Sequence, residues 1–351
     1  MKLRHCLIAG LGLAAGTASL FAWDYEGHRV VNQLALAALP ADFPAFVHEP
    51  DNAERIAFLA GEPDRWRSVP DLPVRHCNAP DHYIDLEDIT AAGVPPAAMS
   101  DLRQIFAQQV AAARLRHPEA FAAIDPTKNA DHTLELVGFL PWTIAEQYGK
   151  LRAAFSYLKA FEEAGTPVEI ANARANIVYL MGVMGHYVGD GAQPLHMTKH
   201  HHGWVGDNPH GYTTWQGFHA WIDGGFVGKV GIDAAGIFPR VKPAAPLSLA
   251  LRPDGRDPVF AATLDYLVVQ HVQLEPLYAL EKAGKLKAEP GADHAEGRTF
   301  IAGQWLKGGE MLGAIWLTAW RSAPPDTYLR AQLLKRQAKA EPMGAPTAGK
   351  R

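Results

Sequence analysis

The feature that most constrains the fold is a nearly apolar segment, residues 172–190, which carries one histidine and one aspartate close to its end. Its length and apolar character predict a buried central helix. His186 and Asp190 are four residues apart, so on a helix they lie on one face. An unpaired carboxylate in apolar surroundings costs free energy. Either the two side chains therefore pair with each other, or both bind something cationic.

The same spacing occurs again at His219 and Asp223, in a segment, 215–223, that is expected to be helical. These are the only two His-x-x-x-Asp pairs in the chain, and seven of its 16 histidines fall between positions 186 and 219. Pro194 cannot extend the first helix, so the chain turns there and can bring His196 back toward the same end. Imidazole and carboxylate ligands together suit Zn²⁺, and more of them converge here than one ion could use.

Two further groupings are left outside this cluster. His200, His201 and His202 stand in a Gly-, His- and Asn-rich segment, 197–214, that is expected to be a loop. Three consecutive histidines on such a loop are typical of a solvated patch. His271 and Glu275 are also four residues apart, and we interpret them as a solvated helix face.

Helical signals dominate the rest of the chain. Helices are expected over 28–39, 101–116, 143–163, 258–283 and 297–321, whereas 61–89 contains four prolines and is expected to be a loop. Strand alternation and internal repeats are absent from the sequence, and a composition of 48% hydrophobic and 20% charged residues is that of a globular protein. We expect an all-α fold: a single helical-bundle domain over 23–334, followed by a disordered Lys-, Ala- and Pro-rich tail over 335–351.

The first 22 residues have the pattern of a secretory signal peptide, because Lys2 and Arg4 precede an apolar stretch of small residues that ends at Ala22. Cleavage after Ala22 would remove Cys6 and leave Cys77 alone, which excludes an internal disulfide. We therefore expect an exported bacterial protein, periplasmic or secreted. The formal net charge of −4 gives no basic surface that would attract nucleic acid by electrostatics alone.

Several segments together resemble the ligand set of the zinc-dependent phospholipase C/P1 nuclease superfamily. They are Trp23-x4-His28, Asp64, His82-Tyr83, Gly185-His186-x3-Asp190-x3-Pro194-Leu195-His196 and His219-x3-Asp223. The resemblance covers the ligand-bearing segments from Trp23 to Asp223 and is closer to the S1/P1-type nucleases. It implies an α-helical bundle with three Zn²⁺ ions at the bottom of a cleft.

The resemblance also implies which residues hold each ion. One zinc would be held by Asp64, His82, His186 and Asp190, and a second by His196, His219 and Asp223. The third would be held by His28, Asp190 and the amino nitrogen and carbonyl oxygen of Trp23, so that Asp190 bridges two ions. Asp81 and Asp85 remain alternatives to Asp64.

The activity implied is hydrolysis of a phosphodiester, with Asp64 and Asp190 as the catalytic carboxylates. Zinc lowers the pKa of bound water to about 7, so a zinc-bound hydroxide can act as the nucleophile. Arg65 and Arg67 could hold phosphate, or be exposed loop arginines. Tyr83 could stack on a base, or be a core tyrosine.

The expected substrate is single-stranded DNA and RNA, cleaved to 5′-phosphate products by a monomer without a protein partner. The short spacing from Trp23 to His28, and Asp223 where the phospholipases carry Glu, favour the nuclease branch. A phospholipase C acting on phosphatidylcholine-like lipids, or an enzyme with both activities, is the alternative. A zinc-binding exported protein without catalysis is a third interpretation. The segment between His82 and His186 is longer than the family leads us to expect, and an insertion that includes 138–142 could reshape the cleft.

Overall fold

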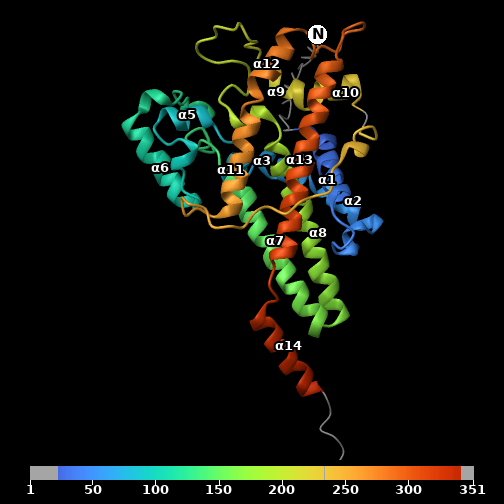
Figure 1. Cartoon of the computed structure of the whole chain (residues 1–351). Coiled ribbons are helices and arrows are strands. Elements are labelled where there is room, and N and C mark those ends of the chain that lie inside the picture. Colours follow the sequence, from blue (N-terminus) through green and yellow to red (C-terminus); the bar gives the residue numbers. More distant parts are fainter. Residues whose placement is uncertain (1–22, 233, 341–351) are drawn as a thin grey trace, which may run out of the picture.

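The computed structural model describes residues 23–232 and 234–340, and in these ranges the chain forms helices and no strand (Figure 1). The prediction of an all-α fold is confirmed. The expected signal peptide, 1–22, and the last residues of the expected tail, 341–351, lie outside the described residues. No helix in the described ranges is both long enough and apolar enough to cross a membrane.

Four helices form the centre of the bundle: α1 (Tyr25–Ala38), α7 (Leu140–Ala164), α8 (Pro167–Asp190) and α13 (Ala295–Ser322). α1 packs against α13 and α8, and α7 packs against α8 and α13 (Figure 1). Thr166 and Glu169 form a reciprocal capping box at the start of α8, which satisfies two backbone N–H groups there. α8 is fully buried from Met181 to Asp190, whereas Tyr179 near its middle is exposed.

Shorter helices surround this centre. The remaining α-helices are α2 (Pro50–Leu59), α3 (Glu62–Ser68), α4 (Leu72–Asn78), α5 (Leu86–Ala91), α6 (Arg103–Arg116), α9 (Phe218–Ala220), α10 (Phe226–Val230), α11 (Pro258–His271), α12 (Leu274–Lys282) and α14 (Thr327–Ala340). The 3₁₀ turns include η2 (Ala79–His82) and η6 (Pro194–Met197), and η7 (Trp221–Gly225) is a π-helical segment.

The expectation of a loop over 61–89 is wrong, because this stretch forms α3, α4, η2 and the start of α5. Pro63, Pro73 and Pro80 each occupy one of the first two positions of an element. The N–H that proline lacks has no helical partner at those positions, so proline there is compatible with a helix.

Three other boundaries differ from expectation. The helix expected over 258–283 is two helices, α11 and α12, that meet at 272–273, and the helix expected from 215 begins at Phe218. α14 continues through 335–340, where the tail was expected to start. Its Leu333 is buried against Ala160 and Ala164 of α7, and its Arg336 pairs with Glu169 of α8 at 2.7 Å.

Candidate metal centre

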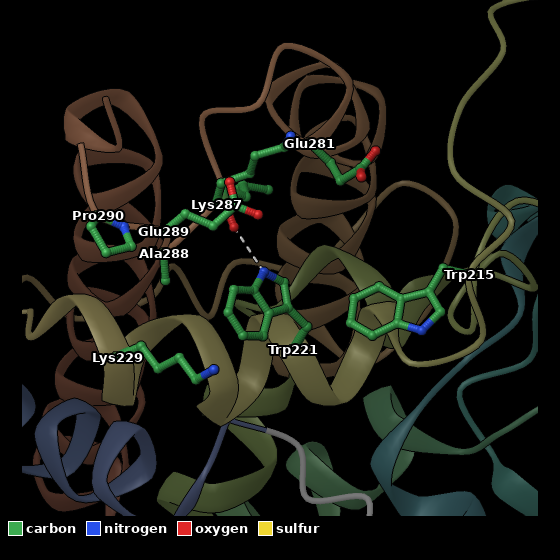
Figure 2. A pocket seen from close by; sticks show the side chains of 9 residues that line it. Trp215, Trp221, Lys229, Glu281, Lys287, Ala288, Glu289 and Pro290 are labelled. Carbon is green, nitrogen blue, oxygen red and sulfur yellow. Dashed lines mark hydrogen bonds between the residues drawn. The ribbon is translucent and has the colours of Figure 1, made fainter. Parts of the chain in front are cut away.

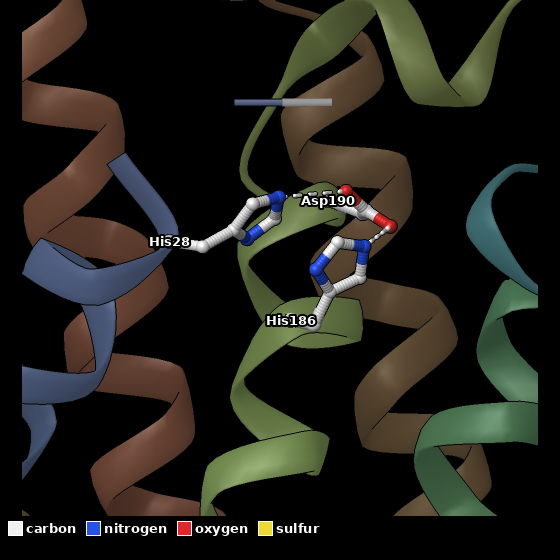
Figure 3. Close-up of side chains that lie close together, drawn as sticks. All are labelled: His28, His186 and Asp190. Atoms are coloured by element: carbon white, nitrogen blue, oxygen red, sulfur yellow. Dashed lines mark ion pairs between the residues drawn. The ribbon is translucent and has the colours of Figure 1, made fainter. Parts of the chain in front are cut away.

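The carboxyl end of α8 and the amino end of α1 bring His28, His186 and Asp190 together (Figure 3). Asp190 Oδ1 lies 3.5 Å from His28 Nε2, and its Oδ2 lies 3.4 Å from His186 Nε2. The two imidazole rings stack with centroids 3.9 Å apart, and all three side chains are fully buried. The i, i+4 face predicted for His186 and Asp190 is therefore present.

Two glycines on α8 allow α1 to approach this closely. A Cβ at Gly189 would lie 2.7 Å from His28 Nδ1, and a Cβ at Gly185 would overlap the side chain of Asn32. Asn32 in turn donates to the carbonyl of Gly182 at 3.0 Å. A larger side chain at either glycine would push the amino end of α1, and His28 with it, away from Asp190.

A second group joins Asp64 of α3, His82 of η2 and His186. His82 Nδ1 lies 2.9 Å from His186 Nε2 and 3.0 Å from Asp190 Oδ2, and Asp64 Oδ1 lies 3.8 Å from His186 Nε2. Asp81 is turned away and pairs with Arg103 at 2.5 Å, and Asp85 belongs to none of the groups found among the described residues. Of the three carboxylates considered from the sequence, Asp64 is the one that lies beside the histidines.

The third group contains His196 of η6, His219 of α9 and Asp223 of η7. His219 Nε2 lies 3.1 Å from both His196 Nε2 and Asp223 Oδ2, and Gln193 donates to Asp223 Oδ1 at 2.8 Å. Asp223 stands in the π-helical segment, and such single-turn segments occur frequently at functional sites. His196 Nδ1, 3.8 Å from Asp190 Oδ1, connects this group to the others.

Hydrogen bonds to backbone carbonyls fix which nitrogens of two histidines are free to bind a cation. His186 Nδ1 lies 2.6 Å from the Ala60 carbonyl, and His196 Nδ1 lies 2.5 Å from the His82 carbonyl. A carbonyl only accepts, so each Nδ1 carries the proton and each Nε2 presents a lone pair to its group. This arrangement of a backbone carbonyl behind an imidazole is the one usually found around bound metals.

The spacing of the groups also fits a shared cation. Two ligand atoms that are each about 2.0–2.1 Å from a tetrahedral zinc lie about 3.3 Å from each other. The distances given above between ligand atoms within the three groups range from 2.9 to 3.8 Å and so fall on both sides of that value. The buried atom Asp190 Oδ1 has no hydrogen-bond partner among the described residues, which leaves it available to an ion.

Burial shifts the ionisation of these groups. It raises the pKa of the Asp190 and Asp223 carboxyls well above the usual range, and lowers the pKa of His82, His186, His196 and His219 well below theirs. The lowered pKa keeps the imidazoles neutral, as a metal ligand must be. A bound divalent cation would in turn stabilise the two carboxylates in their charged form.

Trp23 is fully buried at the same place. Its indole Nε1 donates to the Gly189 carbonyl at 2.9 Å, and its ring packs edge-to-face on Trp305 with centroids 6.0 Å apart. Its backbone N–H donates to the Asp223 carboxylate, which lowers the pKa of that carboxyl against the larger effect of burial. The backbone nitrogen that the resemblance assigns to the ion of His28 and Asp190 therefore contacts Asp223, a member of the third group, instead.

His82 of the second group and His196, His219 and Asp223 of the third line a cleft of about 650 Å³. Arg67 lines the cleft and pairs with Asp64 at 2.7 Å, and Tyr83 lines it with its hydroxyl 3.4 Å from the Leu136 carbonyl. Arg65 does not line it, because its guanidinium pairs with Glu62 and lies over the ring of Phe58.

One wall of the cleft is mostly apolar and comes from the long segment between His82 and His186. Its members are Ala120, Phe121, Ala122, Ala123, Ile124, Leu134, Leu136 and Val137. His82, His196, His219 and Asp223 line the same cleft. The cleft therefore offers polar groups for a charged part of a bound molecule and apolar side chains for the rest of it.

The interpretation of His200, His201 and His202 as a solvated patch is wrong. His200 is 7% exposed and stacks on Trp204 at 4.0 Å, whereas His201 and His202 line the cleft. His271 is also not on a free face, because its Nε2 lies 2.7 Å from Glu87. The sequence signal that could have suggested the position of His201 and His202 in the cleft is their nearness to His196 and His219 along the chain.

A separate pocket of about 470 Å³ lies beside the same π-helical segment (Figure 2). Trp221 lines this pocket, whereas Asp223, two residues later, lines the cleft. Trp215, Lys229 and Lys287 also line it, and Trp221 Nε1 donates to the Leu286 carbonyl at 2.8 Å. None of the groups of histidines and carboxylates described above borders it.

No family model, no curated protein and no solved structure matches this chain.

Proposed function

We propose that this protein is a zinc-dependent phosphodiester hydrolase of the phospholipase C/P1 nuclease type. The observation that supports this is the convergence of three groups of histidines and carboxylates, of which His82, His196, His219 and Asp223 line a cleft. All eight side chains of these groups were proposed as ligands from the sequence. Groups that share residues, as these do at His186, favour several ions over one.

The residues that would hold the ions follow from the groups. Asp64, His82, His186 and Asp190 would hold one, His196, His219 and Asp223 a second, and His28, Asp190 and the backbone of Trp23 a third. Zinc in such a site activates water and neutralises charge on a phosphate. Asp190 would connect the ions, because four imidazoles lie within 3.8 Å of its carboxylate.

The neighbouring residues would orient the ligands and the substrate. The Ala60 and His82 carbonyls hold His186 and His196 in the tautomer that binds a cation, and Gln193 holds Asp223. Arg67 stands at the cleft wall, where a guanidinium can donate to a phosphate oxygen. Neither a serine nor a cysteine nucleophile is needed.

Two substrates are proposed. The resemblance found in the sequence favours single-stranded DNA and RNA, cleaved to 5′-phosphates. The apolar wall of the cleft favours a phospholipid, whose acyl chains would lie against Phe121, Ile124 and Leu136. That the protein is exported, and that it is a monomer, remain predictions from the sequence.

The deciding experiment combines metal analysis with two assays on the purified protein from Trp23 onward. Zinc content is measured first, and then hydrolysis of single-stranded DNA and of a lecithin emulsion. Zinc with one or both activities supports the proposal and identifies the substrate. Zinc without hydrolysis of either would indicate a binding protein, and absence of zinc would refute the proposed centre.

A further inference from the structure

His202 is a cleft residue that the proposed chemistry does not use. It lines the cleft with His196 and His219 but belongs to none of the three groups among the described residues. Its ring lies 5.6 Å from the ring of His219, centroid to centroid, and 4.5 Å from that of His201. It therefore stands beside the centre without being placed to share its ions.

The loop that carries His202 is fixed by contacts on several sides. The Thr198 hydroxyl donates to Glu87 at 2.6 Å, and His201 Nδ1 lies 3.0 Å from the Thr198 carbonyl. The Tyr278 hydroxyl donates to the His200 carbonyl at 2.5 Å. After His202 the chain turns at Gly203, whose φ of 91° is in the region that favours glycine. The position of His202 is thus set by the fold.

The surroundings of the ring indicate which nitrogen meets a bound molecule. His202 Nδ1 is buried and has no hydrogen-bond partner among the described residues. A buried N–H without an acceptor is rarer than a buried acceptor without a donor, so the ring proton is placed on Nε2. Because the imidazole lines the cleft while Nδ1 is enclosed, Nε2–H is the group that it offers.

Arg67 lines the same cleft from the side of Asp64, where its Nε lies 2.7 Å from the carboxylate. His202 and Arg67 therefore bring two N–H donors to one cleft, which His82, His196, His219 and Asp223 also line. Donors arranged in this way suit an oxyanion.

We propose that His202 is a substrate-binding residue whose Nε2–H donates to a non-bridging phosphate oxygen of the substrate, in the cleft that Arg67 also lines. A phosphodiester carries its negative charge on two non-bridging oxygens, so two donors in one cleft are a chemical match. The proposal rests on the proposed function, because it takes the phosphate to be the group that the cleft holds.

The test uses three single variants of the zinc-loaded protein. His202→Leu removes the donor, and His202→Gln keeps an N–H at a similar reach. His210→Leu is the control, because His210 is an exposed histidine of the same loop region and does not line the cleft. For each protein we would measure zinc content, thermal unfolding, the dissociation constant of inorganic phosphate by calorimetry, and kcat/KM for bis(p-nitrophenyl) phosphate.

We expect His202→Leu to keep its zinc and weaken phosphate binding and kcat/KM by about 10-fold, the effect of losing one hydrogen bond to a charged group. His202→Gln should recover most of this, and His210→Leu should match the wild type. Unchanged phosphate affinity in a folded, zinc-loaded His202→Leu would refute the proposal, as would loss of zinc, since His202 would then be a ligand. If the wild type binds phosphate but hydrolyses no phosphodiester, the proposed function fails while the phosphate titrations still decide the role of His202.

Discussion

His82 Nδ1 lies 3.0 Å from Asp190 Oδ2, although the two residues are 108 positions apart in the chain. The same carboxylate lies 3.5 Å from His28, 3.4 Å from His186 and 3.8 Å from His196. One buried aspartate is thus the common neighbour of imidazoles from α1, η2, α8 and η6. The predictions below start from this residue.

Replacing the central carboxylate should affect more than one ion. We expect Asp190→Asn to lose more than one equivalent of zinc and nearly all hydrolysis, because the amide is neutral and can no longer bridge. Zinc analysis of the purified variant and the phosphodiesterase assay provide the measurement. A variant that keeps all its zinc and more than about a tenth of the wild-type rate would contradict the bridging role.

A matched pair of variants tests which aspartate of the 61–89 stretch belongs to the centre. Asp64→Asn should lower the zinc content, because Asp64 lies beside His186. Asp81→Asn should keep its zinc and instead lose the ion pair with Arg103. Zinc loss in Asp81→Asn but not in Asp64→Asn would show that the described position of Asp64 is not the one it takes when metal is bound.

Removal of metal should lower the melting temperature. Ions bound to the folded chain alone stabilise it by about 4 kcal/mol for each site when the free ion is at 1,000 times its dissociation constant. EDTA followed by dialysis should therefore shift the calorimetric melting curve downward and abolish hydrolysis, and added zinc should restore both. An identical curve after verified zinc removal would mean that these groups do not hold an ion.

Acid should release the metal at a pH lower than free histidine would suggest. Burial lowers the pKa of His82, His186 and His196 below 6.5, the ordinary value for histidine. As the pH falls below 6.5, these rings therefore stay neutral in the folded chain, whereas the same rings in an unfolded chain take up protons. Stability from these groups is therefore present above about pH 6.5 and declines as the pH falls. We expect zinc content and activity to fall below about pH 5. Half-loss of zinc already at about pH 6.5 would contradict the effect of burial.

Whether the chain begins at Trp23 should matter for one ion. With Trp23 as the first residue, its α-amino group has a pKa near 8 and can offer a lone pair, whereas the same nitrogen in a longer chain is an amide. The nitrogen already contacts Asp223. A chain with one extra Gly before Trp23 should bind one zinc fewer, with most activity lost and the circular dichroism spectrum unchanged. Equal zinc content and equal rates would exclude Trp23 as a ligand.

What could be predicted from the sequence is what depends on local geometry. The pairing of His186 with Asp190, and of His219 with Asp223, follows from residues four apart on a helix, and both pairs are present in the structure. The all-α fold follows from helical periodicity in the same way.

What could not be predicted depends on contacts between distant residues. The prolines of 61–89 look like loop signals until their places at helix starts are known. His201 and His202 face the cleft because Thr198, Glu87 and Tyr278 hold their loop, and none of those contacts is visible in a run of three histidines. Arg65 and Arg67 are two residues apart, and only the helix that carries them decides that Arg67 lines the cleft.

The burial of Trp23 has a consequence for the order of assembly during synthesis. This residue is made first among those described, yet it packs on Gly189, 166 positions later, and on Trp305 near the far end of the chain. The residues that bury the Trp23 side chain are therefore not present until most of the polypeptide has been synthesised. We therefore expect a nascent chain to lack the complete grouping around Trp23, so that an ion held there would be bound late, after α13 has been made.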